Sequence, residues 1–216
     1  MASSLSPSDA EYNVALEALR QGNIVAYPTE TFYGLAVDPR NQRAVASLYG
    51  LKKREAEKPL SLIVPDLATL SACVSSTPLP YKNLIHRFWP GPLTLIFPAK
   101  EEMFSRLSGG DGTLAIRISS HPVAQKLCSL WGGPLTATSA NISGEAALTS
   151  GEQIRRLWGD HISSLLDGGT VPGGLGSTIV RCDDDNICYL LRHGVIPAEE
   201  IAQSLPDHSS LSPSRF

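Results

Sequence analysis

Four of the chain's 18 basic residues fall within seven positions, at Lys52, Lys53, Arg54 and Lys58. They follow a helical pattern and precede the apolar run 60–64, which places Arg54 and Lys58 on a loop at a sheet edge. Closely spaced cations repel one another, and a bound polyanion such as a nucleoside triphosphate relieves that repulsion. A solvated basic face at a helix end is the alternative. There is no G-x-x-x-x-G-K-[ST] run, so a triphosphate would not be held by a P-loop.

A second polar segment, residues 29–34, comes directly after a predicted strand that ends at Pro28. Ligands of open α/β sheets bind beyond the carboxyl ends of the strands. The hydroxyls of Thr29 and Thr31 could therefore hold a small polar ligand, with Glu30 facing an amine. The alternative is a turn whose side chains satisfy their own backbone. These residues alone do not decide between the two.

A third polar segment, residues 136–144, also follows a short predicted strand. Ser139 and Asn141 can present a hydroxyl, an amide and backbone N–H groups to phosphate oxygens. Ser139 is not in a G-x-S-x-G elbow, so it does not resemble a hydrolase nucleophile. A polar loop that caps the following segment is the alternative.

Thr113 and Arg117 lie four positions apart on one predicted strand, and they therefore share a face of the sheet. An inward-facing arginine requires an anion, because an unpaired buried charge is costly. The planar guanidinium suits a substrate carboxylate. A structural salt bridge is the alternative for Arg117.

Helical and strand patterns alternate along the whole chain, and this alternation predicts an α/β domain with helices packed on a mixed sheet. Ser8 and Glu11 form a capping-box pattern, and Asp66 can cap another helix. The predicted strands cover residues 24–27, 60–64, 93–97, 113–118, 135–138, 162–166, 177–181 and 187–192. The predicted helices cover residues 9–21, 41–51, 67–73, 81–89, 121–131, 153–158 and 196–204. Residues 1–204 are expected to form one domain and residues 205–216 a flexible tail.

Composition excludes several classes of protein. The 216 residues are 42% hydrophobic and 18% charged, which is typical of a globular chain rather than a disordered one. No run reaches the ~18 apolar residues of a membrane span, and residues 1–12 do not resemble a secretory leader. The net charge of −3 argues against a protein whose entire surface binds nucleic acid. Because the sequence shows neither a membrane span nor a leader, we expect no membrane contact.

Cysteine usage indicates a cytoplasmic protein. The four cysteines form no C-x-x-C pair, so a zinc site is not predicted. Four unpaired thiols are expected at Cys73, Cys128, Cys182 and Cys188. The alternative is a Cys182–Cys188 bridge across a hairpin, which a reducing compartment disfavours.

The order of the motifs is more specific than any one of them. The chain contains Pro-Thr-Glu-Thr-x-Tyr-Gly-Leu, Lys-x-Arg-x-x-x-Lys-Pro-Leu, Trp-Pro-Gly-Pro-Leu-Thr, Arg-Ile before a His-Pro, Ser-Ala-Asn-x-Ser-Gly, Gly-Ser-Thr-Ile and Leu-Arg-x-Gly, in this order. This series resembles the threonylcarbamoyl-AMP synthase family, the YrdC-like proteins, in its short, single-domain form. The resemblance covers roughly residues 10–200, and it implies a twisted mixed α/β sheet around a positively charged concave cleft.

The resemblance also implies a reaction. L-threonine, bicarbonate or CO2, and ATP with Mg2+ on its phosphates become L-threonylcarbamoyladenylate and pyrophosphate. A downstream tRNA threonylcarbamoyl-transferase complex then uses the adenylate. Rival interpretations are an RNA-binding module for tRNA or ribosomal RNA, and a carbamoyl-transfer domain. No metal held by the protein itself is implied.

Site residues follow from the matching motif positions. The family's threonine-binding positions correspond to Thr31, Arg117, Ala137 and Ser177. Its ATP-binding positions correspond to Lys52, Arg54, Lys58, Thr113, Ser139, Asn141 and Arg192. Lys52 and Arg54 are expected to be catalytic and exposed, so that replacing either would leave the fold intact.

Two positions depart from the family pattern. Some members have a histidine that contacts threonine on the strand that here reads Leu62-Ile63-Val64. Others have a serine near the nucleotide where this chain has Glu145-Ala146-Ala147. Both departures leave the reaction intact and change its detailed contacts.

Overall fold

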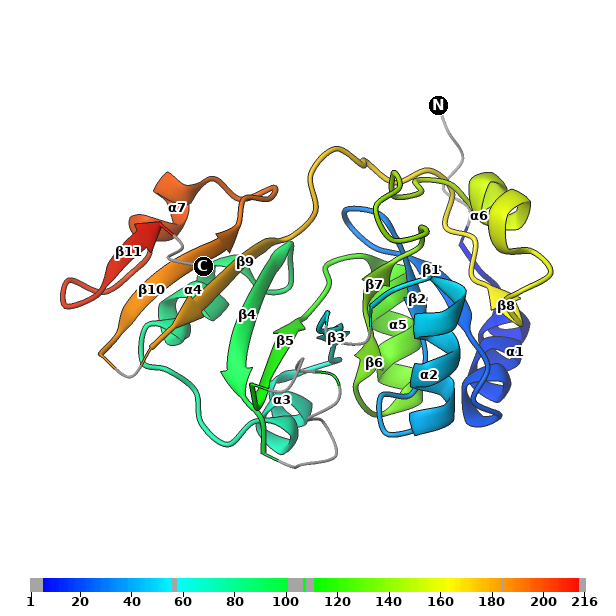
Figure 1. The fold of residues 1–216 in the computed structure, drawn as a ribbon, viewed down its shortest axis with the longest axis horizontal. Helices are drawn as coiled ribbons and strands as arrows, with labels where there is room; N and C mark the ends of the chain where they lie inside the picture. The colour runs from blue at the N-terminus through cyan, green and yellow to red at the C-terminus, as the bar shows by residue number, and fades with distance from the viewer. Residues whose placement is uncertain (1–5, 56–57, 101–106, 108–110, 184, 214–216) are drawn as a thin grey trace.

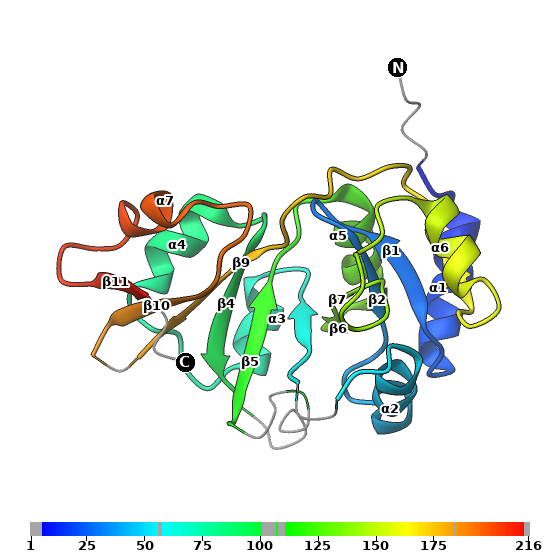
Figure 2. The same cartoon turned by 45° about the horizontal axis from the view of Figure 1, so that its top comes forward.

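Two β-sheets lie side by side and helices pack around them (Figures 1 and 2). The computed structural model describes residues 6–55, 58–100, 107, 111–183 and 185–213. Within these ranges, one sheet has four strands in the order β7-β2-β1-β8 and the other has seven in the order β11-β10-β9-β4-β5-β3-β6. The α/β class predicted from the sequence is confirmed, but its strands divide between two sheets.

The four-stranded sheet consists of β1 (Val25–Pro28), β2 (Tyr33–Ala36), β7 (Thr138–Ser139) and β8 (Ser164–Leu165). The seven-stranded sheet consists of β3 (Ser61–Ile63), β4 (Leu93–Pro98), β5 (Thr113–Arg117), β6 (Leu135–Thr136), β9 (Thr178–Cys182), β10 (Ile187–Arg192) and β11 (Ser210–Pro213). Both sheets are mixed, because β1–β8, β3–β5, β4–β9 and β10–β11 pair in parallel and the other pairs are antiparallel.

Helices lie between and beside these strands. They are α1 (Asp9–Arg20), α2 (Gln42–Leu51), α3 (Leu67–Cys73), α4 (Tyr81–Phe88), α5 (Pro122–Trp131), α6 (Gly151–Trp158) and α7 (Ala198–Ala202). Five of these helices begin after a side chain that accepts free N–H groups of the first turn, namely Ser8, Asn41, Asp66, His121 and Ser150, whereas α4 and α7 begin after Pro80 and Pro197 without such a bond. The predicted capping box of Ser8 and Glu11 and the predicted Asp66 cap are both confirmed. Within the described ranges, every helix is too short or too polar to cross a membrane.

Strand β1 is buried on both of its faces. Val25 and Tyr27 pack against α1 and α5, whereas Ala26 faces the larger core that both sheets share. This alternation follows from the two-residue period of a strand. Strand β1 is therefore held from both sides, and the polar loop that follows it has a fixed base.

The two sheets meet at Ala137. Strand β6 pairs with β3 in one sheet, β7 pairs with β2 in the other, and Ala137 alone lies between them. The amide of Ala137 donates to the carbonyl of Ser61 at 2.7 Å. The chain crosses between the sheets again in the long segment from β8 to β9, at the top of Figure 1. Backbone therefore spans the seam at both of these places.

Cys182 and Cys188 form a disulfide across the β9–β10 hairpin, where they are paired in register. The expectation of four unpaired thiols is therefore wrong for these two residues. Pairing of β9 with β10 brings the two sulfurs within bonding distance. The expectation of free thiols rested on the predicted reducing compartment, which took no account of this pairing. The cytoplasmic location loses its support from cysteine usage and stays a prediction. Cys73 and Cys128 are buried thiols.

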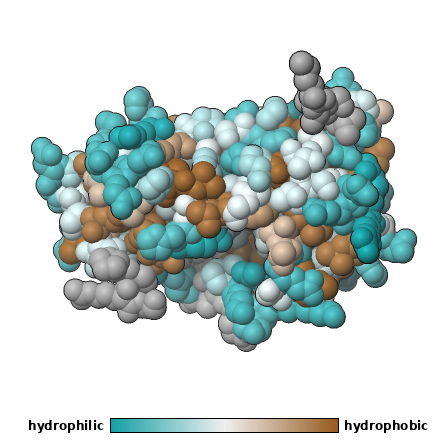
Figure 3. Space-filling model, turned by 90° about the horizontal axis from the view of Figure 1, so that it is seen from above, coloured by the Kyte–Doolittle hydropathy of each residue, from teal (hydrophilic) through white to brown (hydrophobic). Residues whose placement is uncertain are grey.

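The C-terminal segment also differs in part from the expectation. Ser210–Pro213 form β11 and pair with β10, although they lie in the predicted flexible tail. Strand β11 completes one edge of the seven-stranded sheet. Seen from above, most of the surface is hydrophilic or intermediate, with apolar side chains left of centre and toward the lower right (Figure 3).

Candidate active site

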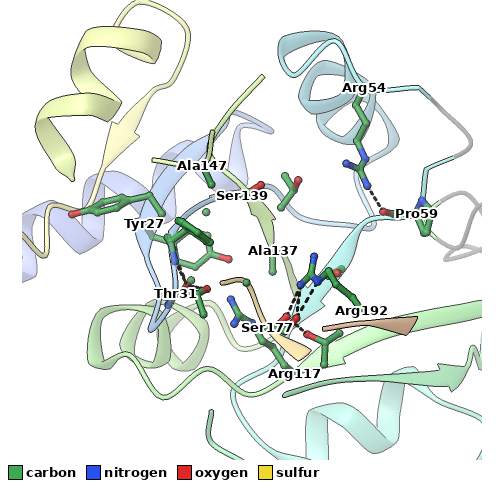
Figure 4. Close-up of a pocket in the computed structure, with 18 residues that line it drawn as sticks. Tyr27, Thr31, Arg54, Pro59, Arg117, Ala137, Ser139, Ala147, Ser177 and Arg192 are labelled. Atoms are coloured by element: carbon green, nitrogen blue, oxygen red, sulfur yellow. Dashed lines mark hydrogen bonds between the residues drawn. The ribbon is translucent and has the colours of Figure 1, made fainter. Parts of the chain in front are cut away.

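A cavity of about 260 Å³ lies in the seam between the two sheets. Its walls come from the β1–β2 loop, the loop after α2, the segment around Ala137, and the ends of β9 and β10. Seven predicted site residues line it: Thr31, Arg54, Arg117, Ala137, Ser139, Ser177 and Arg192. Figure 4 shows Thr31, Arg117 and Ser177 together at one end and Arg54 at the other. Segments far apart in the chain thus converge on one hollow.

Thr31 projects from the loop that joins β1 to β2. Its hydroxyl lies 3.1 Å from that of Thr29, and the Thr29 hydroxyl donates to the carbonyl of Phe32 at 2.7 Å. Because the Thr29 proton is used, Thr31 donates to Thr29, and the lone pairs of Thr31 remain for a ligand. The loop satisfies its own backbone, as the structural alternative proposed, and also lines the cavity.

Arg117 ends β5, and its guanidinium forms a buried ion pair with Glu30. Arg117 Nη1 lies 2.6 Å from Glu30 Oε1, and the two side chains are 8% and 13% exposed. Glu30 Oε2 accepts a hydrogen bond from the hydroxyl of Ser119. Glu30 thus contacts Arg117 and Ser119, and the hypothesis that it faces a ligand amine is not supported by this arrangement.

Ser177, just before β9, lies in a small hydrogen-bonded cluster. Its hydroxyl is 2.7 Å from that of Thr94 and accepts from Arg192 Nη2 at 2.9 Å. Arg192 Nε and Nη2 also donate to the Ser177 carbonyl, at 3.0 and 2.8 Å. Burial lowers the pKa of Arg192, and the nearby charge of Arg117 lowers it further. Arg192, predicted to bind nucleotide, therefore lies beside the predicted threonine contact Ser177.

Arg54 lies across the cavity from this cluster. Its guanidinium donates to the carbonyls of Pro59 and Lys58, at 2.8 and 3.3 Å, and so closes the loop before β3. These contacts leave its charge uncompensated by any carboxylate in the described parts of the chain. A bound anion would supply that compensation.

Lys52 is placed differently from the expectation, because its side chain is 1% exposed. Its ammonium donates to the carbonyl of Asn141 at 2.6 Å and to the carbonyl of Ser139. Burial lowers the pKa of Lys52 to about 8, with a further lowering from the charge of Arg54. The prediction of an exposed Lys52 is therefore wrong. The side chain ties α2 to the Ser139–Asn141 loop.

Three other predicted nucleotide residues do not line the cavity. Lys58 is exposed and forms an ion pair with Glu55 at 3.2 Å. The Thr113 hydroxyl donates to Asp111 at 2.7 Å. Asn141 supports the loop from within, and its amide nitrogen donates to the carbonyl of Glu145 at 2.6 Å. Contacts between these side chains and a nucleotide stay predictions.

The structure adds Thr94 to the site and gives Glu30 a role other than the one predicted. Thr94 lines the cavity, and Glu30 holds Arg117 from behind. Thr94 is the last residue of the Trp-Pro-Gly-Pro-Leu-Thr motif, so the motif series could have indicated it as a site residue. No spacing in the sequence indicated the Glu30–Arg117 pair, because the two residues lie 87 positions apart.

The fold and the site define an α/β protein with an arginine-lined cavity between two sheets. Residues 17–194 match the Sua5/YciO/YrdC family model, whose description is "Telomere recombination". The chain belongs to this family.

Two curated relatives are named threonylcarbamoyl-AMP synthase. The Bacillus subtilis relative is 39% identical over 198 residues, which cover 91% of this chain and 57% of that one. The Halorhodospira halophila relative is 43% identical over 162 residues, which cover 75% and 82%.

A solved structure, the crystal structure of P. abyssi Sua5 complexed with L-threonine, resembles the chain with a TM-score of 0.88. The two are 33% identical, and the alignment covers 95% of this chain and 60% of that one. This chain therefore spans less than two thirds of the B. subtilis and P. abyssi proteins.

Proposed function

We propose that the protein is an L-threonylcarbamoyladenylate synthase. It converts L-threonine, bicarbonate or CO2, and ATP into threonylcarbamoyl-AMP and pyrophosphate, and a tRNA-modifying transferase complex consumes the adenylate. The observation that carries the proposal is the cavity itself, with one end lined by hydroxyls and two arginines and Arg54 at the opposite end. The names of the relatives and the threonine in the P. abyssi structure support it.

The amino acid would bind at the Arg117 end. Arg117 takes the carboxylate through guanidinium N–H groups other than those that contact Glu30. Thr31 offers lone pairs, and Ser177 lies opposite, so a ligand with both an amine and a hydroxyl meets suitable partners. The methyl group of Ala137 forms the wall between these residues and the other end of the cavity.

The nucleotide phosphates would lie toward Arg54 and the Ser139 loop. Arg54 supplies charge. The Ser139 hydroxyl donates to Asn141 Oδ1, so it would have to turn away from that partner to donate to a phosphate oxygen. In the described ranges, no three His, Cys, Asp or Glu residues are grouped as metal ligands. This donor set fits Mg2+ that arrives on the triphosphate and keeps its waters, rather than an ion held in a protein cage.

The chemistry requires positioning more than proton transfer by side chains. The amine of threonine attacks CO2 and yields a carbamate with loss of a proton, or it attacks bicarbonate and yields the same carbamate with loss of water. A carbamate oxygen then attacks the α-phosphorus of ATP, and pyrophosphate leaves. Holding both reactants in one cavity makes the second step effectively unimolecular, and the arginines compensate the charge that gathers there.

Pyrophosphate release tests the proposal directly. We expect release with ATP, Mg2+ and bicarbonate only when L-threonine is also present, and not with serine or valine at equal concentration. Release without threonine, or none at all, would contradict the proposal. RNA binding with steep salt dependence and no turnover would favour the RNA-binding module instead.

A matched pair of arginine variants localises the activity. Arg54→Ala removes the cation at the proposed phosphate end, and we expect kcat/KM for ATP to fall about 10- to 100-fold. Arg43→Ala removes an exposed arginine on α2, which does not line the cavity, and should leave turnover unchanged. Equal losses in both variants would argue against the assigned phosphate end.

A further inference from the structure

The carboxylate of Glu30 lies behind the cavity wall rather than in it. Its Oε1 accepts from Arg117 Nη1 at 2.6 Å, and its Oε2 accepts from the hydroxyl of Ser119. Arg117 lines the cavity and Glu30 does not. Any effect of Glu30 on a ligand must therefore pass through Arg117.

The ion pair joins the two sheets. Glu30 lies in the loop between β1 and β2 of the four-stranded sheet, and Arg117 ends β5 of the seven-stranded sheet. Their side chains are 13% and 8% exposed, so the attraction between them is screened little by solvent. The pair holds the Arg117 side chain at the point where the two sheets face each other.

A guanidinium is planar, and its five N–H donors have a fixed geometry. Fixing Nη1 against Glu30 therefore limits the directions in which the remaining donors point. Since a carboxylate is bound best by two parallel N–H groups, a rotation of this plane would weaken its binding.

Charge gives a second reason for this carboxylate. Arg117 and Arg192 both line the same end of the cavity, where their positive charges repel. Glu30 compensates one of the two charges in the absence of ligand. The ligand carboxylate would compensate the other.

We infer that Glu30 is a positioning residue that aims Arg117 at the carboxylate of the amino-acid substrate. This inference rests on the proposed function, because it assigns that carboxylate to Arg117. A purely structural role would give a different result. Loss of the pair would then lower stability without a selective effect on the amino acid.

The test compares variants of the full chain that differ by single groups. Glu30→Gln keeps the shape and loses the charge, Glu30→Asp keeps the charge and shortens the reach, and Ser119→Ala removes the second contact of Glu30. Asp9→Asn is the control, because it removes an ion pair with Lys126 on the outer surface. Steady-state kinetics and calorimetric binding of L-threonine are measured below the unfolding temperature of each variant.

We expect Glu30→Gln to raise the KM and the Kd for threonine about 10- to 100-fold while the KM for ATP changes less than about twofold. Glu30→Asp and Ser119→Ala should show smaller losses of the same kind, and Asp9→Asn none. If Glu30→Gln does not fold, the other two variants carry the test.

Two outcomes would overturn the inference. One is wild-type threonine affinity in the folded Glu30 variants, and the other is an equal rise of KM for both substrates. Wild-type protein that releases no pyrophosphate with threonine would instead contradict the proposed function. The two failures are therefore distinguishable.

Discussion

The ammonium of Lys52 lies 2.6 Å from the backbone carbonyl of Asn141, and it also donates to the carbonyl of Ser139. A side chain at the end of α2 thus satisfies two acceptors of a loop almost ninety residues further along the chain. This contact defines the shape of the loop that lines the cavity.

Lys52→Met should destabilise the fold as well as stop turnover. Methionine keeps the length of the stem but leaves the two carbonyls without their donor, while removal of the buried charge offsets part of the loss. We expect unfolding free energy to fall by about 1–3 kcal/mol in urea titrations. Lys53→Met, at the exposed neighbour, should change it by less than about 0.5 kcal/mol. A Lys52→Met protein as stable as wild type would show that the contact adds no stability.

The same residue makes stability depend on pH in a defined direction. Burial lowers the pKa of Lys52 from 10.5 to about 8, so the unfolded chain binds more protons between these values. Stability from this group therefore rises as pH increases from about 8 to 10.5, by an amount on the order of 3 kcal/mol. The stability difference between wild type and Lys52→Met should widen over this window. A constant difference would contradict the lowered pKa.

Thr94→Val should weaken the use of threonine without unfolding the protein. Thr94 and Ser177 carry two hydroxyl protons and share one hydrogen bond, while Arg192 only donates. One proton is therefore left for an acceptor in the cavity. Removal of the Thr94 hydroxyl lets Ser177 adopt other orientations, and we expect kcat/KM for threonine to fall about fivefold.

Thr94→Ser is the control for this prediction, because it keeps the hydroxyl and should retain most of the activity. Serine removes the methyl group of Thr94, and valine replaces its hydroxyl with a second methyl group. If both variants lose activity equally, altered packing rather than the hydroxyl explains the effect. The KM for ATP, measured in the same assays, should not change in either variant.

Reduction of the Cys182–Cys188 disulfide should lower the stability of the β9–β10 hairpin. The bridge closes a loop with a sequence separation of 6, and chain entropy predicts a contribution of about 2 kcal/mol for so short a loop. Thermal unfolding with and without dithiothreitol measures this contribution. The double variant Cys182→Ser/Cys188→Ser should match the reduced wild type and show no response to dithiothreitol. Equal unfolding temperatures of oxidised and reduced protein would contradict the prediction.

Local signals in the sequence predicted the elements well. The helix starts at Ser8, Asn41 and Asp66 could be predicted, because each of these side chains accepts from N–H groups only two or three residues further along the chain. Strand β2 was not predicted, because its residues 33–36 were included in a polar motif whose apolar half forms the strand. Strand β11 was missed for a related reason. Its composition is that of a tail, and only its pairing with β10 makes it a strand.

The sequence predicted those site residues that a motif identifies by residue type. It did not predict the contacts that depend on partners distant in the chain. The order of the motifs indicated that Arg54, Arg117 and Asn141 converge; Arg54 and Arg117 line one cavity, whereas Asn141 does not line it and supports the loop that does. The burial of Lys52 depends on backbone carbonyl groups in a distant loop. Every residue has such a carbonyl, so the sequence does not show which ones will accept from Lys52. The pairing of Glu30 depends likewise on how the two sheets face each other.

Ala137, the lone residue between β6 and β7, sets a limit on how the chain can vary in length. An insertion there would turn the residues of β7 to the opposite face, since side chains alternate along a strand. Ser139 would then leave the cavity wall, and the backbone pairing with β2 would lose its register. We therefore expect insertions and deletions to be tolerated in the outer loops and not in the seam, so the spacing between Leu135 and Ser139 should matter more for a working cavity than the identity of any one residue within it.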